Sequence, residues 1–273
     1  MNGRRNHHEY RYKQHHLWQH NVPTRVVFWV FTFAFLAVIV TLFSTQFQSV
    51  LPRSIGSVFS RISIGKLLSY GLFTFLRLLT AYVLGLVATA VVIFLVSIHE
   101  KIEAFLVPIL DILQSVPVLA FFPLIIIAFA DLHAPEFSAL IVLFMAMTWS
   151  VMFGALGGLH QIPEDIFEAA EIYGAKGFKK FTKIIFPSIF PNLVTGSILS
   201  FGAGWNVIII SEYINYGRVE IRLPGLGNLL SSSAGNDPGI FLMSLITLVL
   251  IITLVNRFVW HRLTNYSEKF KFE

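Results

Sequence analysis

The sequence predicts an all-α membrane protein of about six transmembrane helices, with both termini in the cytoplasm. Of its 273 residues, 55% are hydrophobic and only 13% are charged, whereas a soluble domain carries about 25% charged residues. Uncharged runs such as Val26–Phe43, Leu78–Ile98 and Ile240–Asn256 reach or approach the roughly 20 residues that cross a hydrocarbon core about 30 Å thick. The composition therefore excludes an ordinary soluble domain.

The first 24 residues are polar and rich in histidine, so we expect a solvated tail over 1–24. Its histidines are His7, His8, His15, His16 and His20. A metal site is the alternative, but such a tract offers no fixed ligand geometry. A long polar stretch precedes the first apolar run and no small-residue cleavage site follows a short apolar core, so we expect the first span to be retained.

Six apolar segments form one expected transmembrane domain over 25–260, followed by a cytoplasmic C-terminal tail over 261–273. The segments are Arg25–Phe43, Leu68–Ser97, Ala104–Ala130, Phe137–Leu156, Phe190–Ile210 and Gly239–Trp260. Residues 44–66, between the first two segments, are predicted to form a loop because they include Pro52 and Gly56.

The third segment contains Pro108, Pro117 and Pro123. A proline in a membrane helix frees a backbone carbonyl, which neighbouring protein or water must satisfy. We therefore expect a kinked helix that faces the bundle interior and lines a path.

The distribution of Lys and Arg orients the helices. The chain has 20 Lys and Arg residues. If the amino terminus is cytoplasmic, Arg77 lies within the second span and most of the others lie on the cytoplasmic side. Five lie on the outer side: Arg53, Arg61, Lys66, Arg218 and Arg222. Cytoplasmic loops carry the excess of positive charge, so both termini and the loop between the fourth and fifth helices are expected in the cytoplasm.

That loop, 161–186, is polar where its neighbours are apolar. Pro163 suits the first helical position, and Glu164 and Asp165 fall in the first turn, where the helix dipole favours acids. Gly174 permits the left-handed conformation that ends helices. A short helix, a sharp turn and a second helix are predicted.

The turn carries little side-chain bulk, so another protein could approach it closely. The small residues are Ala169, Ala170, Gly174 and Ala175, with Glu168 at their edge. The lysines and phenylalanines that follow would equally suit an amphipathic connector lying on the membrane surface. The residues by themselves leave these two interpretations open.

The spacing of this loop resembles the EAA motif of binding-protein-dependent ABC importer permeases. The pattern is Glu168-Ala169-Ala170, three residues, Gly174, nine residues, Ile184, two residues and Pro187, with Phe186 where a leucine is common. The resemblance extends from about Ser69 to Trp260, and Pro108–Pro123 is similar to the third-helix region of nitrate, sulfonate and taurine type permeases.

The resemblance implies a type I ABC importer permease fold, in a prokaryotic inner or plasma membrane. The implied partners are a dimer of cytoplasmic ABC ATPase subunits, a second permease subunit (identical or similar) and an extracytoplasmic substrate-binding protein. The implied cargo is a small anion such as nitrate, sulfonate or taurine. The implied ATPase-docking residues are Glu168, Ala169, Ala170, Gly174 and Ala175.

Motifs for catalysis are missing from the sequence, so we expect neither an enzyme nor a cofactor. There is no G-x-x-x-x-G-K-S/T loop for ATP, no G-x-S-x-G or H-E-x-x-H motif and no cysteine. Energy for transport is expected from a partner ATPase. We use the net charge of +5 to orient the helices and expect no nucleic acid partner.

Polar groups in the spans mark a candidate path or bundle network: Arg77, Asp111, Gln114 and Pro117. Charge is costly in the membrane, so one hypothesis pairs Arg77 with Asp111 and places Gln114 closer to the path. Alternatively, Arg77 extends to the interface and Asp111 lies near the headgroups. Glu212 is expected in an outer loop, either solvated or facing a substrate-delivering protein.

Two rival functions remain. An ion-coupled secondary transporter or channel would use Arg77, Asp111 and Gln114 as a relay. A membrane anchor for a cytoplasmic enzyme would use the 161–186 loop for docking alone.

Overall fold

The computed structural model describes residues 62–98, 100–131, 134–216 and 219–270. The predicted tail over 1–24, the predicted span Arg25–Phe43 and most of the predicted loop over 44–66 lie outside these residues. All structural statements below refer to the described part of the chain.

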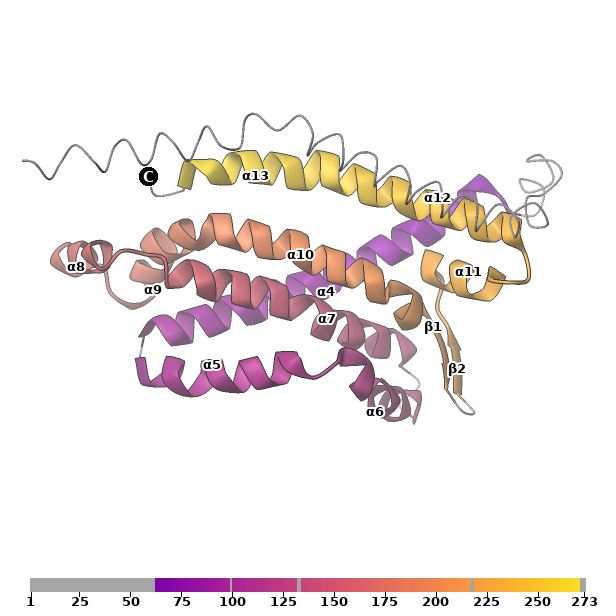
Figure 1. The fold of residues 1–273 in the computed structure, drawn as a ribbon, viewed down its shortest axis with the longest axis horizontal. Helices are drawn as coiled ribbons and strands as arrows, with labels where there is room; N and C mark the ends of the chain where they lie inside the picture. Colours follow the sequence, from indigo (N-terminus) through magenta and orange to yellow (C-terminus); the bar gives the residue numbers. More distant parts are fainter. Residues whose placement is uncertain (1–61, 99, 132–133, 217–218, 271–273) are drawn as a thin grey trace, which may run out of the picture. The chain divides into compact units, whose positions relative to one another are not determined.

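Long helices run between two ends of the described bundle (Figure 1). Four of them are long and apolar enough to cross a membrane, and a bent pair raises this number to five. The four spans are α4 (Ile64–Ile98), α7 (Pro135–Leu159), α10 (Phe186–Glu212) with the short turns that precede it from Gly177, and α12 (Pro238–Val255) with its continuation to Phe270. The helical membrane architecture is thus confirmed, and each of these helices contains the span predicted for it.

The third predicted helix is two helices rather than one. α5 (Glu100–Ser115) and α6 (Val118–Asp131) meet at an angle of 80°. The break falls at Pro117, which lacks a backbone N–H and disfavours the helical conformation in the residue before it. Pro108 and Pro123 lie inside α5 and α6 without breaking them.

α7 is the central helix, packed most extensively on α10 and then on α4. Glycines allow the close approach: a Cβ built on Gly196 of α10 would lie 2.7 Å from the carbonyl oxygen of Ser150 on α7. One built on Gly154 would lie 3.0 Å from the Gly196 Cα. Small residues at such contacts are how membrane helices gain packing energy where lipid offers no hydrophobic driving force.

Two further turns depart from regular α-helix. Phe181–Ile185, just before α10, and Asn256–Trp260, just before α13 (His261–Ser267), are π-helical. The loop between α7 and α10 holds α8 (Glu164–Ile172) and α9 (Gly177–Lys180). These two short helices lie at one end of the bundle (Figure 1).

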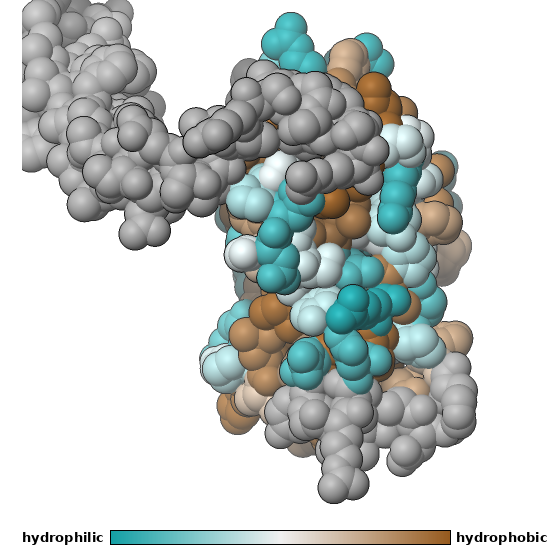
Figure 2. All heavy atoms as spheres, turned by 90° about the vertical axis from the view of Figure 1, so that its right-hand side faces the viewer, coloured by the Kyte–Doolittle hydropathy of each residue, from teal (hydrophilic) through white to brown (hydrophobic). Residues whose placement is uncertain are grey.

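The opposite end carries a β-hairpin that was not predicted. β1 (Tyr213–Tyr216) pairs antiparallel with β2 (Val219–Arg222), and α11 (Leu226–Ser233) follows. On β2, hydrogen bonds to the Glu220 carboxylate raise the pKa of the Arg222 guanidinium. Figure 2 looks onto this end, and hydrophilic residues form much of the visible face, as expected where a bundle leaves the hydrocarbon region.

Candidate functional site

α8 ends in a Schellman turn, which explains the small residues of the loop. The Ala175 N–H donates to the Ala170 carbonyl at 2.8 Å, and the Gly174 N–H donates to the Glu171 carbonyl at 3.0 Å. Gly174 has φ +68°, a conformation that glycine adopts at no steric cost. The hydrogen bonds therefore satisfy carbonyls that the end of a helix would otherwise leave unpaired.

The predicted docking residues divide into two groups. Ala170 and Ala175 are buried, as the two apolar positions of a Schellman turn commonly are when they meet. Glu168, Ala169 and Gly174 are exposed. Thus the alanines that the motif singles out serve different purposes, and only part of the predicted set is open to a partner.

α8 is fixed to the bundle through its other face. Ile166 and Phe167 pack against a buried cluster that includes residues of α4, α7 and α10. The Lys180 ammonium lies 4.7 Å from the centre of the Phe167 ring, an arrangement that attracts the cation to the ring face. A force on α8 would therefore reach three membrane spans through packed side chains.

Two large apolar side chains project from the end of α8. Ile172 is 82% exposed and Tyr173 is 84% exposed. We define the α8 surface as Glu168, Ala169, Ile172, Tyr173 and Gly174. Exposed apolar groups rimmed by polar ones mark interaction sites, and the prediction missed Ile172 and Tyr173 because it looked for small residues alone.

At the other end of the bundle, Arg77 lies in a buried polar network. Its guanidinium donates to Glu212 at 2.5 Å and makes two 2.8 Å hydrogen bonds to Glu136. The Arg77 side chain is 5% exposed and the Glu212 side chain 0%. Thr74 and the Gly227 N–H also donate to Glu212, so the network joins α4, α7, α10 and α11.

This network corrects two expectations. Arg77 pairs with Glu212 and Glu136 rather than with Asp111. Glu212 is the last residue of α10 and fully buried, so it is neither solvated nor free to meet another protein. Arg77 and Glu212 are 135 positions apart in the chain, so no local sequence pattern indicates that they pair.

The other predicted path residues lie on α5 and at its end. Gln114 donates to Asp111 at 2.7 Å, and Pro117 occupies the break between α5 and α6. Asp111 is exposed on the bundle surface. The structure therefore brings Asp111 and Gln114 together and gives Arg77 other partners.

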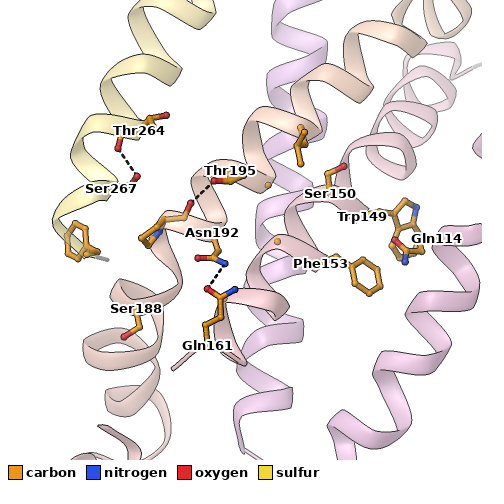
Figure 3. A pocket seen from close by; sticks show the side chains of 16 residues that line it. Gln114, Trp149, Ser150, Phe153, Gln161, Ser188, Asn192, Thr195, Thr264 and Ser267 are labelled. Atoms are coloured by element: carbon orange, nitrogen blue, oxygen red, sulfur yellow. Dashed lines mark hydrogen bonds between the residues drawn. The ribbon is translucent and has the colours of Figure 1, made fainter. Parts of the chain in front are cut away.

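Gln114 also lines a polar cleft of about 720 Å³ between α5, α7, α10 and the C-terminal turns (Figure 3). Carboxamide, hydroxyl, glycine and aromatic residues share the lining, and none of the lining residues is charged: Gln114, Trp149, Ser150, Phe153, Gly154, Gly158, Gln161, Ser188, Pro191, Asn192, Thr195, Gly196, Leu199, Thr264, Ser267 and Phe270. Except for Gln114, the prediction missed these residues, which only the packing of α7 on α10 assembles.

Comparison with known protein families identifies one that matches most of the described bundle. Residues 81–261 match the family described as "Binding-protein-dependent transport system inner membrane component". This range includes the loop with α8 and nearly all of the cleft.

Individual relatives are similar over shorter stretches. The chain is 28% identical to the bicarbonate transport system permease protein CmpB of Synechococcus elongatus, over 46% of this chain and 45% of that protein. It is 26% identical to the nitrate import permease protein NrtB of Leptolyngbya laminosa, over 52% and 50%, and 27% identical to the taurine transport system permease protein TauC of Escherichia coli, over 50% and 46%. The matches thus span about half the length of these relatives.

Proposed function

We propose that this chain, which belongs to the family of binding-protein-dependent transport system inner membrane components, is the permease subunit of an ATP-driven ABC importer. A partner ATPase would supply the energy, because the chain has no nucleotide-binding loop. The orientation that fits the Lys and Arg distribution has six spans, both termini in the cytoplasm and α8 on the cytoplasmic side.

The α8 surface is the observation that carries this proposal. Ile172 and Tyr173 offer apolar anchors beside the acidic Glu168, while the buried face of α8 packs on the spans. In this proposal an ATPase dimer receives the α8 surface in a groove. The loop must bind the ATP-closed and open forms of the ATPase with different free energies, because otherwise hydrolysis could not shift the permease between its states.

A second permease subunit, identical or similar, would cover the face that carries Asp111 and Gln114. Ionisable residues on membrane helices face protein or water rather than lipid, and Asp111 is exposed on this chain. The uncharged cleft opens between the same helices, so the cargo path would lie between the two subunits. An extracytoplasmic binding protein would deliver the cargo to the end that carries α11.

The proposed cargo is a small anion of the bicarbonate, nitrate, sulfonate or taurine class. The names of the similar permeases support this class. An ion-coupled transporter is less well supported, because Arg77 is held by two carboxylates and takes no part in a relay with Asp111 and Gln114.

Uptake into vesicles tests the function directly. The chain would be reconstituted with the ATPase and binding protein encoded beside it, and labelled bicarbonate, nitrate and taurine would be supplied outside. We expect accumulation only when ATP is available to the ATPase subunits. Uptake driven by an ion gradient without ATP would instead establish the secondary transporter.

Docking is tested by site-specific crosslinking, which the absence of cysteine makes simple. Tyr173→Cys places a single thiol on the α8 surface, and Asn236→Cys places one at the opposite end of the bundle. After labelling with a photoactivatable maleimide, Tyr173→Cys should crosslink to the ATPase and Asn236→Cys should not. Equal crosslinking of both, or of neither, would contradict docking through α8.

A further inference from the structure

The polar cleft contains a set of hydrogen-bond donors that the proposed function leaves unassigned. Three of its side chains are carboxamides, Gln114, Gln161 and Asn192, and several others are hydroxyls. Gln161 lies in the turn between α7 and α8. Asn192 lies on α10 and Gln114 near the end of α5, within helices that can cross a membrane, where such groups are costly unless they meet a polar partner. The arrangement of their hydrogens decides which kind of partner fits.

Three of the five hydroxyl side chains that line the cleft donate their single hydrogen to a backbone carbonyl three or four residues earlier in the chain. Ser188 donates to the Ile184 carbonyl at 2.8 Å, Thr195 to the Pro191 carbonyl at 3.1 Å and Ser267 to the Thr264 carbonyl at 2.7 Å. A hydroxyl carries only one donor hydrogen. These three groups therefore cannot donate to a solute without giving up an internal hydrogen bond.

The carboxamides keep donor hydrogens for a solute. Asn192 donates one hydrogen to Gln161 at 3.4 Å, and Gln114 donates one to Asp111 at 2.7 Å. Because each carboxamide nitrogen carries two hydrogens, Asn192 and Gln114 each retain one and Gln161 retains both. Figure 3 shows Asn192 and Gln161 side by side across the contact between α7 and α10.

The charge of the residues that line the cleft also bears on which solute the cleft can bind. Among the described residues that line the cleft, none is a carboxylate, which would repel an anion, and none is a Lys or Arg, which would hold one tightly. A path must bind its solute well enough to admit it and weakly enough to release it. Neutral N–H donors meet both requirements for an anion, since they replace part of its hydration without a fixed opposite charge.

We propose that Asn192 and Gln161 form a transient binding site for a small oxyanion on its way through the permease. Gln114 is left out of this site because the Asp111 carboxylate, 2.7 Å from its nitrogen, would repel an anion there. The assignment rests on the proposed function and gives it a location. Trp149 and Phe153 also line the cleft and supply apolar surface there. The Asp111 carboxylate is outside the lining.

Isosteric charge substitution tests the site. Asn192→Asp and Gln161→Glu change almost no volume but place a carboxylate among the donors. In vesicles that hold the ATPase and are supplied with nitrate, bicarbonate or methanesulfonate, each variant should import the anion at least about tenfold more slowly than the wild type, because like charges within a few ångströms repel strongly. The matched control is Asn236→Asp, which is exposed and remote from the cleft; its uptake should equal that of the wild type.

Each variant must still co-purify with the ATPase subunits, which separates a folding defect from a transport defect. Because the Gln161 side chain is exposed, we expect Gln161→Glu to disturb folding least. If the wild type imports one of the anions and both carboxylate variants import it at the wild-type rate, the cleft assignment is wrong while the proposed function stands. If the wild type shows no ATP-dependent uptake at all, the proposed function itself fails. A wild-type preference for cations over all three anions would overturn the oxyanion assignment alone.

Discussion

Arg77 on α4 and Glu212 at the end of α10 form an ion pair at 2.5 Å with both side chains buried. The pair fastens two spans to α11, because the Gly227 N–H donates to the same carboxylate at 2.7 Å. Glu136 holds the other side of the guanidinium, and its side chain is 52% exposed.

Removing either buried partner should be costly. Arg77→Gln leaves the Glu212 carboxylate buried without its cation, and we expect a loss of about 3–5 kcal/mol in the free energy of unfolding. Glu212→Gln leaves Arg77 paired with Glu136 alone and should cost less than Arg77→Gln. Glu136→Gln, at the half-exposed carboxylate, should cost about 1 kcal/mol or less. Thermal unfolding of the purified protein in detergent measures all three, and equal losses for Glu136→Gln and Glu212→Gln would contradict this ranking.

Position 225 needs a glycine because the Glu212 carboxylate leaves no room for a Cβ there, and not because of the backbone conformation. Its backbone is extended, with φ 175°, but a Cβ at this position would overlap the carboxylate. Gly225→Ala should therefore lower the unfolding temperature. In a Glu212→Ala background, which removes the obstructing group, the further effect of Gly225→Ala should be small, and simple additivity of the two changes would show that the contact is unimportant.

The contact between α7 and α10 predicts different outcomes for neighbouring glycines. A Cβ on Gly196 would meet the Ser150 carbonyl oxygen at 2.7 Å, whereas nothing lies within 4 Å of a Cβ on Gly157. Gly196→Ala should destabilise the protein by about 1–3 kcal/mol, the usual cost of overpacking, and Gly157→Ala should not destabilise it. The comparison uses unfolding temperatures, and similar values for both variants would refute the close helix contact.

The turn at Gly174 should control coupling through its conformation. Nothing lies within 4 Å of a Cβ there, but φ is +68°, which costs a residue with a Cβ roughly 1–2 kcal/mol. Gly174→Leu should uncouple ATP hydrolysis from uptake, while Gly174→Asn should retain coupling because asparagine tolerates this conformation. The measurement is ATP hydrolysed per solute imported, with Gly65→Leu, at an equally open position, as the control; unchanged coupling in Gly174→Leu would argue against the role.

Local patterns in the sequence predict local structure well. The spans follow from uncharged runs, the break in the third helix follows from Pro117, and the end of α8 follows from Gly174. Apolar or aromatic residues alternate with polar ones over parts of 213–222, a pattern typical of a strand. The pattern is short and easily overlooked beside the much longer apolar runs of the spans. Each of these features depends on residues within a few turns of one another.

Contacts between distant segments could not be predicted in the same way. The partners of Arg77 depend on how α4, α7 and α10 pack, and the nearby Asp111 is the more obvious partner in sequence terms. The cleft has the same origin, since Asn192 and Gln161 are 31 positions apart. The burial of Ala170 and Ala175 follows from one Schellman turn, but a list of small residues does not separate the internal ones from the exposed ones.

The division within α8 has a practical consequence for engineering. Loop shape depends on Ala170, Gly174 and Ala175, whereas the groups available to a partner include Ala169, Ile172 and Tyr173. We expect that the exposed group can be exchanged for that of another permease while the turn is left intact. Permeases with redirected ATPase pairing could be made in this way, and two importers could then operate in one cell without sharing their motor subunits.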